Sequence, residues 1–393
     1  MQVNLSVKKI NFVFLFTSIL RRNIYKMRNH TIKIGITHGD INGIGYEVIL
    51  KTLEDSRIFE MCTPIIYGSP KIAAYHRKAL NINNLSFNHI RHVSEAYTKK
   101  ANIINCIDDN TRVELGKSTQ EAGLAAYNAL ERAVSDLQKG DIDALITAPI
   151  NKDNIQNDNF RFSGHTEYLA HKLEAKNHLM LMVSENMRIG VVTTHIPIKQ
   201  VAENLNKDII LSKIRILARS LQQDFGITRP KIAVFGLNPH AGDNGLIGKE
   251  EKDFILPAII QAKKEGIIAL GPYPADGFFG SDDYMKFDAI LAMYHDQGLI
   301  PFKLTSFDRG VNYTAGLPAI RTSSAHGTAY SLAGEGKASP ESFRQALYLA
   351  VDIYKNREIH AEISKNPLKK YDINPNQIDE SVDIEASEDE DNL

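Results

Sequence analysis

The chain has 393 residues, of which 43% are hydrophobic and 24% charged, and its formal net charge is -1. This balance is typical of a globular protein that buries a substantial core, and it excludes a fibrous or wholly disordered chain. Nucleic-acid binding is not favoured, because the sequence has no basic stripe, no RNP-like motif and no zinc-finger spacing.

The cysteines and the two ends of the chain indicate where in the cell the protein is expected to be. Cys62 and Cys106 match neither a CxxC pair nor a secreted disulfide framework, so we expect a cytoplasmic protein. The segment "KKINFVFLFTSILRR" is too short to span a bilayer, and no A-x-A site follows it, so no membrane association is expected. We expect residues 1–26 to be a dispensable leader before Met27, with an ordered extension or a targeting signal as alternatives. The acidic residues 366–393 are expected to form a disordered tail.

Short β-rich runs alternate with amphipathic helical stretches from Thr31 onward, which predicts an α/β fold with a mainly parallel or mixed sheet. Strands are expected at 32–37, 64–68, 144–149, 179–183, 189–195, 231–237 and 289–295. Helices are expected at 119–139, 203–225, 249–265 and 340–354. Residues 27–365 should form the catalytic region in two lobes, with a boundary near 150–165 and the C-terminal helix packing back on the first lobe.

The first glycine-rich loop, "GITHGDINGIGYEVI", follows an expected strand and precedes an expected helix. Gly39, Asp40 and Gly43 could therefore bring backbone amides close to an anion or a cofactor. The loop lacks the third glycine of the dinucleotide fingerprint, and a tight structural turn would explain it equally well. Asn238 and Gly242 of "GLNPHAG" are two further candidate cofactor contacts.

A second loop region carries "TAPINK" and "SGHTEYLAHKL". Alone, "TAPINK" reads as an ordinary strand exit. Ser163 or Thr166 could cap a helix that holds Glu167 in its first turn, which would leave His165 beside free backbone amides. A capping role needs no ligand, so the structural and the functional interpretation both stay open for this stretch.

Three histidines each follow an expected strand: His195 in "VVTTHIP", His240 in "FGLNPHAG" and His295 in "LAMYHDQG". In open α/β sheets, ligands bind outside the carboxyl ends of the strands, where residues from distant positions converge. Neutral imidazoles suit zinc, cobalt and similar divalent ions. The alternative is that each histidine is a hydrogen-bonded loop residue.

Basic residues follow in glycine-interrupted turns, from "GLIPFKL" to "DRGVNYTAGLPAIRTSSAHGTA". Arginine, lysine and asparagine on such turns are suited to phosphate or carboxylate recognition, and the alternative is a solvated loop. The candidate residues in this region are Lys303, Arg309, Asn312, Arg321 and His326.

The ordered series of these motifs, over about residues 31–354, resembles the 4-hydroxythreonine-4-phosphate dehydrogenase family (PdxA) of pyridoxal 5′-phosphate biosynthesis. That resemblance implies the two-lobed α/β/α fold of isocitrate and isopropylmalate dehydrogenases, which bind NAD without the usual fingerprint. The family's first loop usually reads "GDPAGIGPE", whereas this chain has Ile41, Asn42 and Tyr46 in place of Pro, Ala and Pro. Losing two prolines is expected to loosen the loop and weaken cofactor binding.

The resemblance also implies roles for individual residues. His195, His240 and His295 would bind one divalent metal, zinc, magnesium or cobalt. A homodimer is implied, with the active site in the cleft and at the subunit interface, where His195 faces the other two ligands. The implied substrate contacts are His165, Thr166, Lys303, Asn312 and Arg321.

The implied reaction oxidises the C3 hydroxyl of 4-phosphooxy-L-threonine with NAD or NADP, and decarboxylation to 3-amino-2-oxopropyl phosphate follows. The sequence does not identify the general acid or base, for which Asp296 and Lys303 are both near the last histidine motif. Three alternatives stay open: dehydrogenation of a phosphorylated threonate or erythronate, a metal-dependent phosphohydrolase, and a metal-binding protein without catalytic activity.

Overall fold

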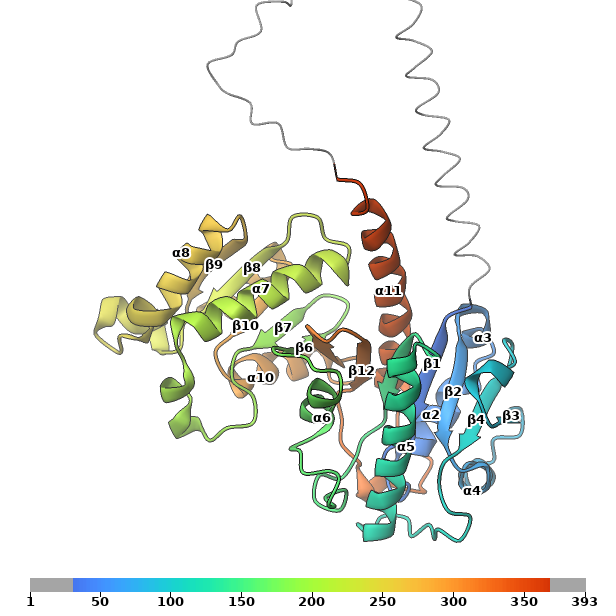
Figure 1. The fold of residues 1–393 in the computed structure, drawn as a ribbon. Coiled ribbons are helices and arrows are strands. Elements are labelled where there is room, and N and C mark those ends of the chain that lie inside the picture. The colour runs from blue at the N-terminus through green and yellow to red at the C-terminus, as the bar shows by residue number, and fades with distance from the viewer. Residues whose placement is uncertain (1–30, 368–393) are drawn as a thin grey trace, which may run out of the picture.

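The computed structural model describes residues 31–367, which form a mixed α/β structure around one twelve-stranded sheet (Figure 1). The expected leader at 1–26 and all but two residues of the expected tail at 366–393 lie outside the described residues. The strands are β1 (Lys33–Thr37), β2 (Thr63–Gly68), β3 (Phe87–Ile90), β4 (Ala101–Asn105), β5 (Ala144–Thr147), β6 (Leu179–Val183), β7 (Arg188–Val191), β8 (Lys231–Phe235), β9 (Ile268–Tyr273), β10 (Ala289–Ala292), β11 (Val311–Ala315) and β12 (Ile320–Ser324).

The strand order is β3-β4-β2-β1-β5-β12-β11-β6-β7-β10-β8-β9. Strands from β3 to β12 are parallel to one another, and so are the strands from β7 to β9. Between these two blocks, β12 pairs with β11, β11 with β6, and β6 with β7, each time antiparallel. Three reversals leave the two parallel blocks running in opposite directions. The expectation of a mixed sheet in an α/β fold is confirmed.

Helices cover the sheet, and Figure 1 shows them on its flanks. Helix α5 begins after Thr119, whose hydroxyl accepts from Ala122 N, and ends before Gly140, which has a left-handed conformation; these bounds are close to the expected 119–139. The helices are α2 (Gly45–Leu53), α3 (Ile58–Met61), α4 (Pro70–Ala79), α5 (Gln120–Lys139), α6 (His165–Lys172), α7 (Lys207–Gln223), α8 (Leu256–Lys264), α9 (Ala275–Gly280), α10 (His295–Ser306) and α11 (Glu341–Ile363).

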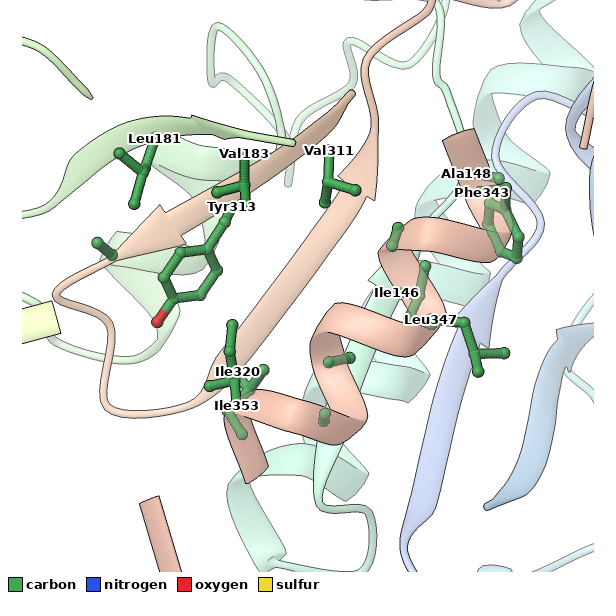
Figure 2. Packing of buried hydrophobic residues seen from close by; sticks show 14 of the residues in the cluster. Ile146, Ala148, Leu181, Val183, Val311, Tyr313, Ile320, Phe343, Leu347 and Ile353 are labelled. Carbon is green, nitrogen blue, oxygen red and sulfur yellow. The ribbon is translucent and has the colours of Figure 1, made fainter. Parts of the chain in front are cut away.

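Helix α11 is longer than its expected span of 340–354 and contacts β5, β11 and β12 as well as α2 and α7. Its buried side chains Phe343, Leu347 and Ile353 point toward the apolar face of these strands (Figure 2). Burial of each such side chain contributes about 1.5–3 kcal/mol to the free energy of unfolding. Helix α11 therefore packs on the central strands of the sheet, β5, β12 and β11, and also contacts the helices α2 and α7.

A buried carboxylate, Asp224, joins three elements near this centre. It accepts hydrogen bonds from Ser220 Oγ at 2.6 Å, Tyr313 Oη at 2.6 Å and Arg357 Nε at 2.7 Å, and so connects the end of α7 to β11 and α11. Asp224 is fully buried, and the Asp224–Arg357 pair is the charged part of this network. Removing one member of a buried ion pair leaves the other charge without compensation.

The described part of the chain contains no helix that is both long enough and apolar enough to cross a membrane. The thiols of Cys62 and Cys106 are both free. Burial raises the pKa of each thiol to about 12, so both are expected to stay protonated at neutral pH.

Asp224→Ala should lower the free energy of unfolding by about 3 kcal/mol, because it leaves the partly buried Arg357 guanidinium and the buried Tyr313 hydroxyl without their acceptor. Urea unfolding followed by circular dichroism measures the change. Asp158→Ala is the control, since Asp158 pairs with Arg161 on the surface and that pair should contribute almost nothing. Equal stability of the two variants would contradict a structural role for the Asp224 network.

Candidate active site

The centre of the candidate site is Arg321 on β12, which is only 3% exposed. Its guanidinium donates to Thr147 Oγ1 from Nε at 3.2 Å and from Nη2 at 2.7 Å. Nη1 donates to Thr314 Oγ1 at 3.3 Å and to Thr166 Oγ1 at 3.5 Å. Among the described residues Arg321 has no ion-pair partner, and burial lowers its pKa to about 10. A buried cation with only neutral partners is suited to binding an anion.

His165 and Thr166 begin helix α6 beside Arg321. Residue Gly164 occupies the N-cap position and no side chain caps the helix, so the expected capping role of Ser163 or Thr166 is wrong. The Thr166 hydroxyl accepts instead from Arg321. Burial and the positive charges of Arg321 and Lys152 hold the pKa of His165 well below its ordinary value. His165 is therefore a neutral imidazole at physiological pH.

Two charged residues that were not predicted as site residues, Lys152 and Glu167, lie close to Gly164. A Cβ atom built on this glycine would lie 3.6 Å from Lys152 Cε and 3.5 Å from Glu167 Oε2. The positive charge of Lys152 lowers the pKa of His165 and of His195, and the carboxylate of Glu167 acts in the opposite sense on His195. The two charges therefore connect the Arg321 region electrostatically with the histidine region.

His195 and His295 lie side by side, with ring centroids 5.8 Å apart and ring planes inclined by 45°. The His295 ring contacts Asp296 Oδ1 through Nδ1 at 2.7 Å, which leaves Nε2 for another partner. A carboxylate on one ring nitrogen is the usual arrangement of a metal-binding histidine. Burial, and then the charge of Lys152, lowers the pKa of His195. Both rings are thus suited to metal binding, although the described residues of one chain hold no group of three or more candidate ligands.

Hydrogen bonds between strand ends fix this pair. The hydroxyl of Thr193, after β7, donates to Met293 O at 2.8 Å, after β10. Gln297 joins β10 to β8, because its amide donates to Gly236 O at 2.7 Å and accepts from Met293 N at 2.7 Å. Strand β7 ends at Val191 rather than at His195 as expected, so His195 lies on the loop beyond it.

His240 is exposed on the segment η4 (Pro239–Gly245), and within the described residues it does not complete a group of three candidate metal ligands with this pair. Residues 240–244 all have positive φ, which is rare for residues other than glycine. Buried Glu251 holds the segment, because its carboxylate accepts from Leu237 N at 2.8 Å, from Asn238 N at 2.8 Å and from Asn238 Nδ2 at 3.0 Å. A Cβ atom on Gly242 would lie 2.4 Å from Glu251 Oε2.

The first glycine-rich loop packs tightly against two other segments. A Cβ atom on Gly39, whose φ is 71°, would lie 2.2 Å from Pro149 O, and one on Gly43 would lie 2.7 Å from Thr328 O. The carboxylate of Asp40 accepts from Asn42 N, from Asn154 Nδ2 at 2.8 Å and from Tyr330 Oη at 2.7 Å. These contacts give the loop glycines and Asp40 structural roles, and their contact with a cofactor stays a prediction.

The expectation that this loop is loosened by its missing prolines is wrong. Ile41, Asn42 and Tyr46 are fully buried. The Tyr46 ring stacks between His38, at 5.1 Å, and His76, at 5.0 Å, and its hydroxyl accepts from Ser69 N. The Asn42 side chain accepts from Glu114 N at 2.7 Å and donates to Lys117 O at 2.9 Å. Tertiary contacts thus fix the loop without the two prolines.

The remaining candidate residues are placed differently. Asn312 on β11 is opposite Ser323 on β12, and its buried Oδ1 has no hydrogen-bond partner among the described residues. His326 Nδ1 donates to Gly327 O at 3.0 Å, and the buried Nε2 of His326 has no hydrogen-bond partner among the described residues either. Lys303 and Arg309 are exposed, and the structure shows no contact between Lys303 and Arg321 within the described chain.

Residues 60–350 match the family described as pyridoxal phosphate biosynthetic protein PdxA. The chain belongs to the PdxA family. A relative from Bacteroides thetaiotaomicron named 4-hydroxythreonine-4-phosphate dehydrogenase is 54% identical over 88% of this chain and 94% of its own length. A relative from Oceanobacillus iheyensis, provisionally named D-threonate 4-phosphate dehydrogenase, is 39% identical over 81% of this chain and 97% of its own.

Solved structures show that this chain has the fold of the PdxA family. The 4-hydroxythreonine-4-phosphate dehydrogenase of Klebsiella pneumoniae has a TM-score of 0.74 and 35% identity, covering 82% of this chain and 98% of its own. A terephthalate 1,2-cis-dihydrodiol dehydrogenase from Burkholderia xenovorans shares the fold alone, with a TM-score of 0.57 and 24% identity over 82% of this PdxA chain and 98% of its own.

Glu251→Ala should release the η4 segment, because it removes the acceptor for two backbone amides and opens space beside Gly242. We expect faster amide hydrogen exchange over 237–245 and a loss of stability of roughly 2 kcal/mol. Glu250→Ala is the control, since Glu250 accepts from the Asn238 side chain, whereas the backbone amides of Leu237 and Asn238 donate to Glu251. Unchanged exchange in the Glu251 variant would mean that other contacts hold the segment.

Proposed function

We propose that this PdxA-family protein oxidises 4-phosphooxy-L-threonine with NAD or NADP and that the product, 2-amino-3-oxo-4-phosphooxybutanoate, decarboxylates to 3-amino-2-oxopropyl phosphate. The buried and ion-unpaired guanidinium of Arg321 carries the proposal, because it supplies the cation that a small phosphorylated acid needs. The name of the 54% identical relative supports the choice of substrate. Free thiols support a cytoplasmic location.

The residues around Arg321 would bind and orient the substrate. Arg321 would hold one anionic group, and the Thr166 hydroxyl, already in contact with it, would donate to the same group. Neutral His165 would contact a hydroxyl or amine of the substrate without repelling Arg321. Asn312 would use its unpartnered Oδ1 as an acceptor for the substrate amine. Such contacts align the reacting carbon before oxidation begins.

His195 and His295 fit a divalent metal, zinc, magnesium or cobalt, because their rings are adjacent and Asp296 occupies only Nδ1 of His295. A metal held there would supply Lewis-acid stabilisation of the substrate oxygen. The pairing differs from the arrangement implied by the resemblance, in which His195 faced His240 and His295 across the subunit interface. We therefore propose that His240 of a second chain supplies the third ligand.

A homodimer is proposed for the same reason, and the outward face of α10 supports it. Ile300, Leu304 and Phe307 are 65%, 87% and 62% exposed and follow helical spacing on the helix that begins with His295. Exposed apolar stripes of this kind mark protein interfaces. Lys303 lies on the same exposed helix, so a subunit contact there would bring Lys303 toward a shared site.

NAD or NADP is proposed as the oxidant, because a dehydrogenase needs an acceptor for the hydride. The five candidate residues do not offer free groups in one chain: Asp40 and Asn238 are hydrogen-bonded, and Gly39, Gly43 and Gly242 are covered. The role of these five residues in cofactor binding stays a prediction.

Dehydrogenation of D-threonate 4-phosphate is the second candidate function, supported by the name of the 39% identical relative.

Purified protein with NAD or NADP should produce the reduced cofactor, measured by its absorbance, with 4-phosphooxy-L-threonine in preference to D-threonate 4-phosphate. Arg321→Ala and Lys303→Ala should each lower kcat/KM, by an amount that corresponds to a loss of roughly 2 kcal/mol or more of transition-state stabilisation, because a substrate anion loses its charged partner. Lys264→Ala, on the exposed side of α8, is the control. Release of free phosphate without cofactor reduction would replace the proposal with a phosphohydrolase.

Mixed dimers test the metal site. His195→Ala and His240→Ala homodimers should be inactive, but equal co-refolding should restore about a quarter of wild-type activity, because half of the dimers regain one of two sites. His240→Ala mixed with His295→Ala should recover equally. His195→Ala mixed with His295→Ala should recover nothing, because two rings that are adjacent in one chain would belong to the same half-site. Differential tags confirm mixing, and recovery in the last mixture would contradict the pairing.

A further inference from the structure

Arg321 is surrounded by threonines from both neighbouring strands. On β5, Thr147 is opposite Ser323, and Leu145 is opposite Arg321, so Thr147 and Arg321 project from the same face of the sheet. On the other side, Thr314 belongs to β11. Thr147 and Thr314 are both fully buried. The sheet register therefore fixes two hydroxyls within reach of the guanidinium.

Thr147 binds one particular edge of the guanidinium. Its Oγ1 accepts from Nε at 3.2 Å and from Nη2 at 2.7 Å, so one oxygen takes both donors on the Nε side. The opposite edge, formed by Nη1 and Nη2, is bound less closely: Nη1 donates to Thr314 Oγ1 at 3.3 Å and to Thr166 Oγ1, in the first turn of α6, at 3.5 Å. A planar guanidinium binds a phosphate or carboxylate with two parallel donors. The edge toward α6 is the one left for such a ligand.

The chemical nature of the partner matters as much as its position. A carboxylate at position 147 would orient the guanidinium equally well, but it would neutralise the charge that an anionic ligand needs. A hydroxyl accepts the two N–H groups and leaves the positive charge uncompensated. Because Thr147 is fully buried, water cannot replace its hydroxyl without opening the sheet.

We propose that Thr147 is a positioning residue that holds Arg321 with its Nη1–Nη2 edge toward α6, ready for an anionic oxygen of the ligand. The inference rests on the proposed function only in taking Arg321 as the group that binds the substrate anion. Thr147 does not touch the substrate, and it acts through Arg321. Its removal should weaken anion binding without removing any charge.

The test compares Thr147→Val, which has almost the same shape and no hydroxyl, with Thr147→Ser, which keeps the hydroxyl. With 4-phosphooxy-L-threonine, the valine variant should raise KM by about tenfold to hundredfold, while kcat changes by less than about threefold. The serine variant should stay near wild type. Thr322→Val is the matched control, because Thr322 is an equally buried threonine on β12 that donates to Ala346 O on α11 and not to Arg321.

A second readout uses inorganic phosphate as the probe and needs no turnover. Phosphate should raise the Tm of the wild type, the serine variant and Thr322→Val, and its effect should be lost in Thr147→Val and Arg321→Ala. Adding Thr147→Val to Arg321→Ala should change KM no further. Should the valine variant not fold, Thr147→Ala takes its place in both measurements. Unchanged KM and an unchanged phosphate effect in the folded variant would overturn the proposal.

The two proposals fail separately in this design. If the wild type binds phosphate through Arg321 but oxidises neither phosphorylated substrate, the proposed function fails and the role of Thr147 stands. If the wild type turns over its substrate and Thr147→Val has the same KM, the role of Thr147 fails and the proposed function stands.

Discussion

The constraint on which the candidate site depends is the burial of one uncompensated positive charge, that of Arg321, in the middle of the sheet. Taking a guanidinium out of water is costly unless hydrogen bonds satisfy its donors. Here hydroxyls from β5, β11 and α6 accept hydrogen bonds from the guanidinium, so three elements must be placed correctly before the charge can be accommodated. The stability of the fold and the proposed binding of an anion are therefore coupled, because the threonine hydroxyls that compensate for the burial of Arg321 also orient its guanidinium.

The reversal of strand direction in the sheet explains how the site joins distant parts of the chain. Strands β7, β8 and β10 run parallel to one another, so the three histidine segments leave the sheet at a common edge. Strands β5 and β12 run the other way, across the antiparallel β11–β6–β7 link. The long segment between β5 and β6 spans this change of direction, and it carries Lys152, His165 and Glu167. Charges on this segment consequently influence both Arg321 and His195.

Local signals in the sequence predicted the parts of the fold that local physics decides. Thr119 and Gly140 mark the ends of α5, and the apolar runs before the histidines do form strands β8 and β10. Tertiary contacts decided the rest. The stacking of Tyr46, the left-handed course of residues 240–244 and the pairing of His195 with His295 depend on residues far away in the sequence. Glu167 was expected in the first turn of a helix, as observed, but neither it nor Lys152 was predicted as a site residue, because nothing in their spacing shows that both would lie beside Gly164.

The exposed and the buried parts of the site support different conclusions about assembly. Arg321, Thr147 and Thr166 lie together within one chain, so this part of the proposed anion site is formed without a second copy. The histidine pair is incomplete by comparison, since two imidazoles leave coordination positions of a divalent ion open and the described chain adds no third ligand beside them. His240 and Lys303 are both exposed, as residues that serve a neighbouring subunit must be. Under these proposals, a monomer would bind the anionic end of the substrate but would lack the metal chemistry. Substrate binding without turnover would then indicate that the shared site is not assembled.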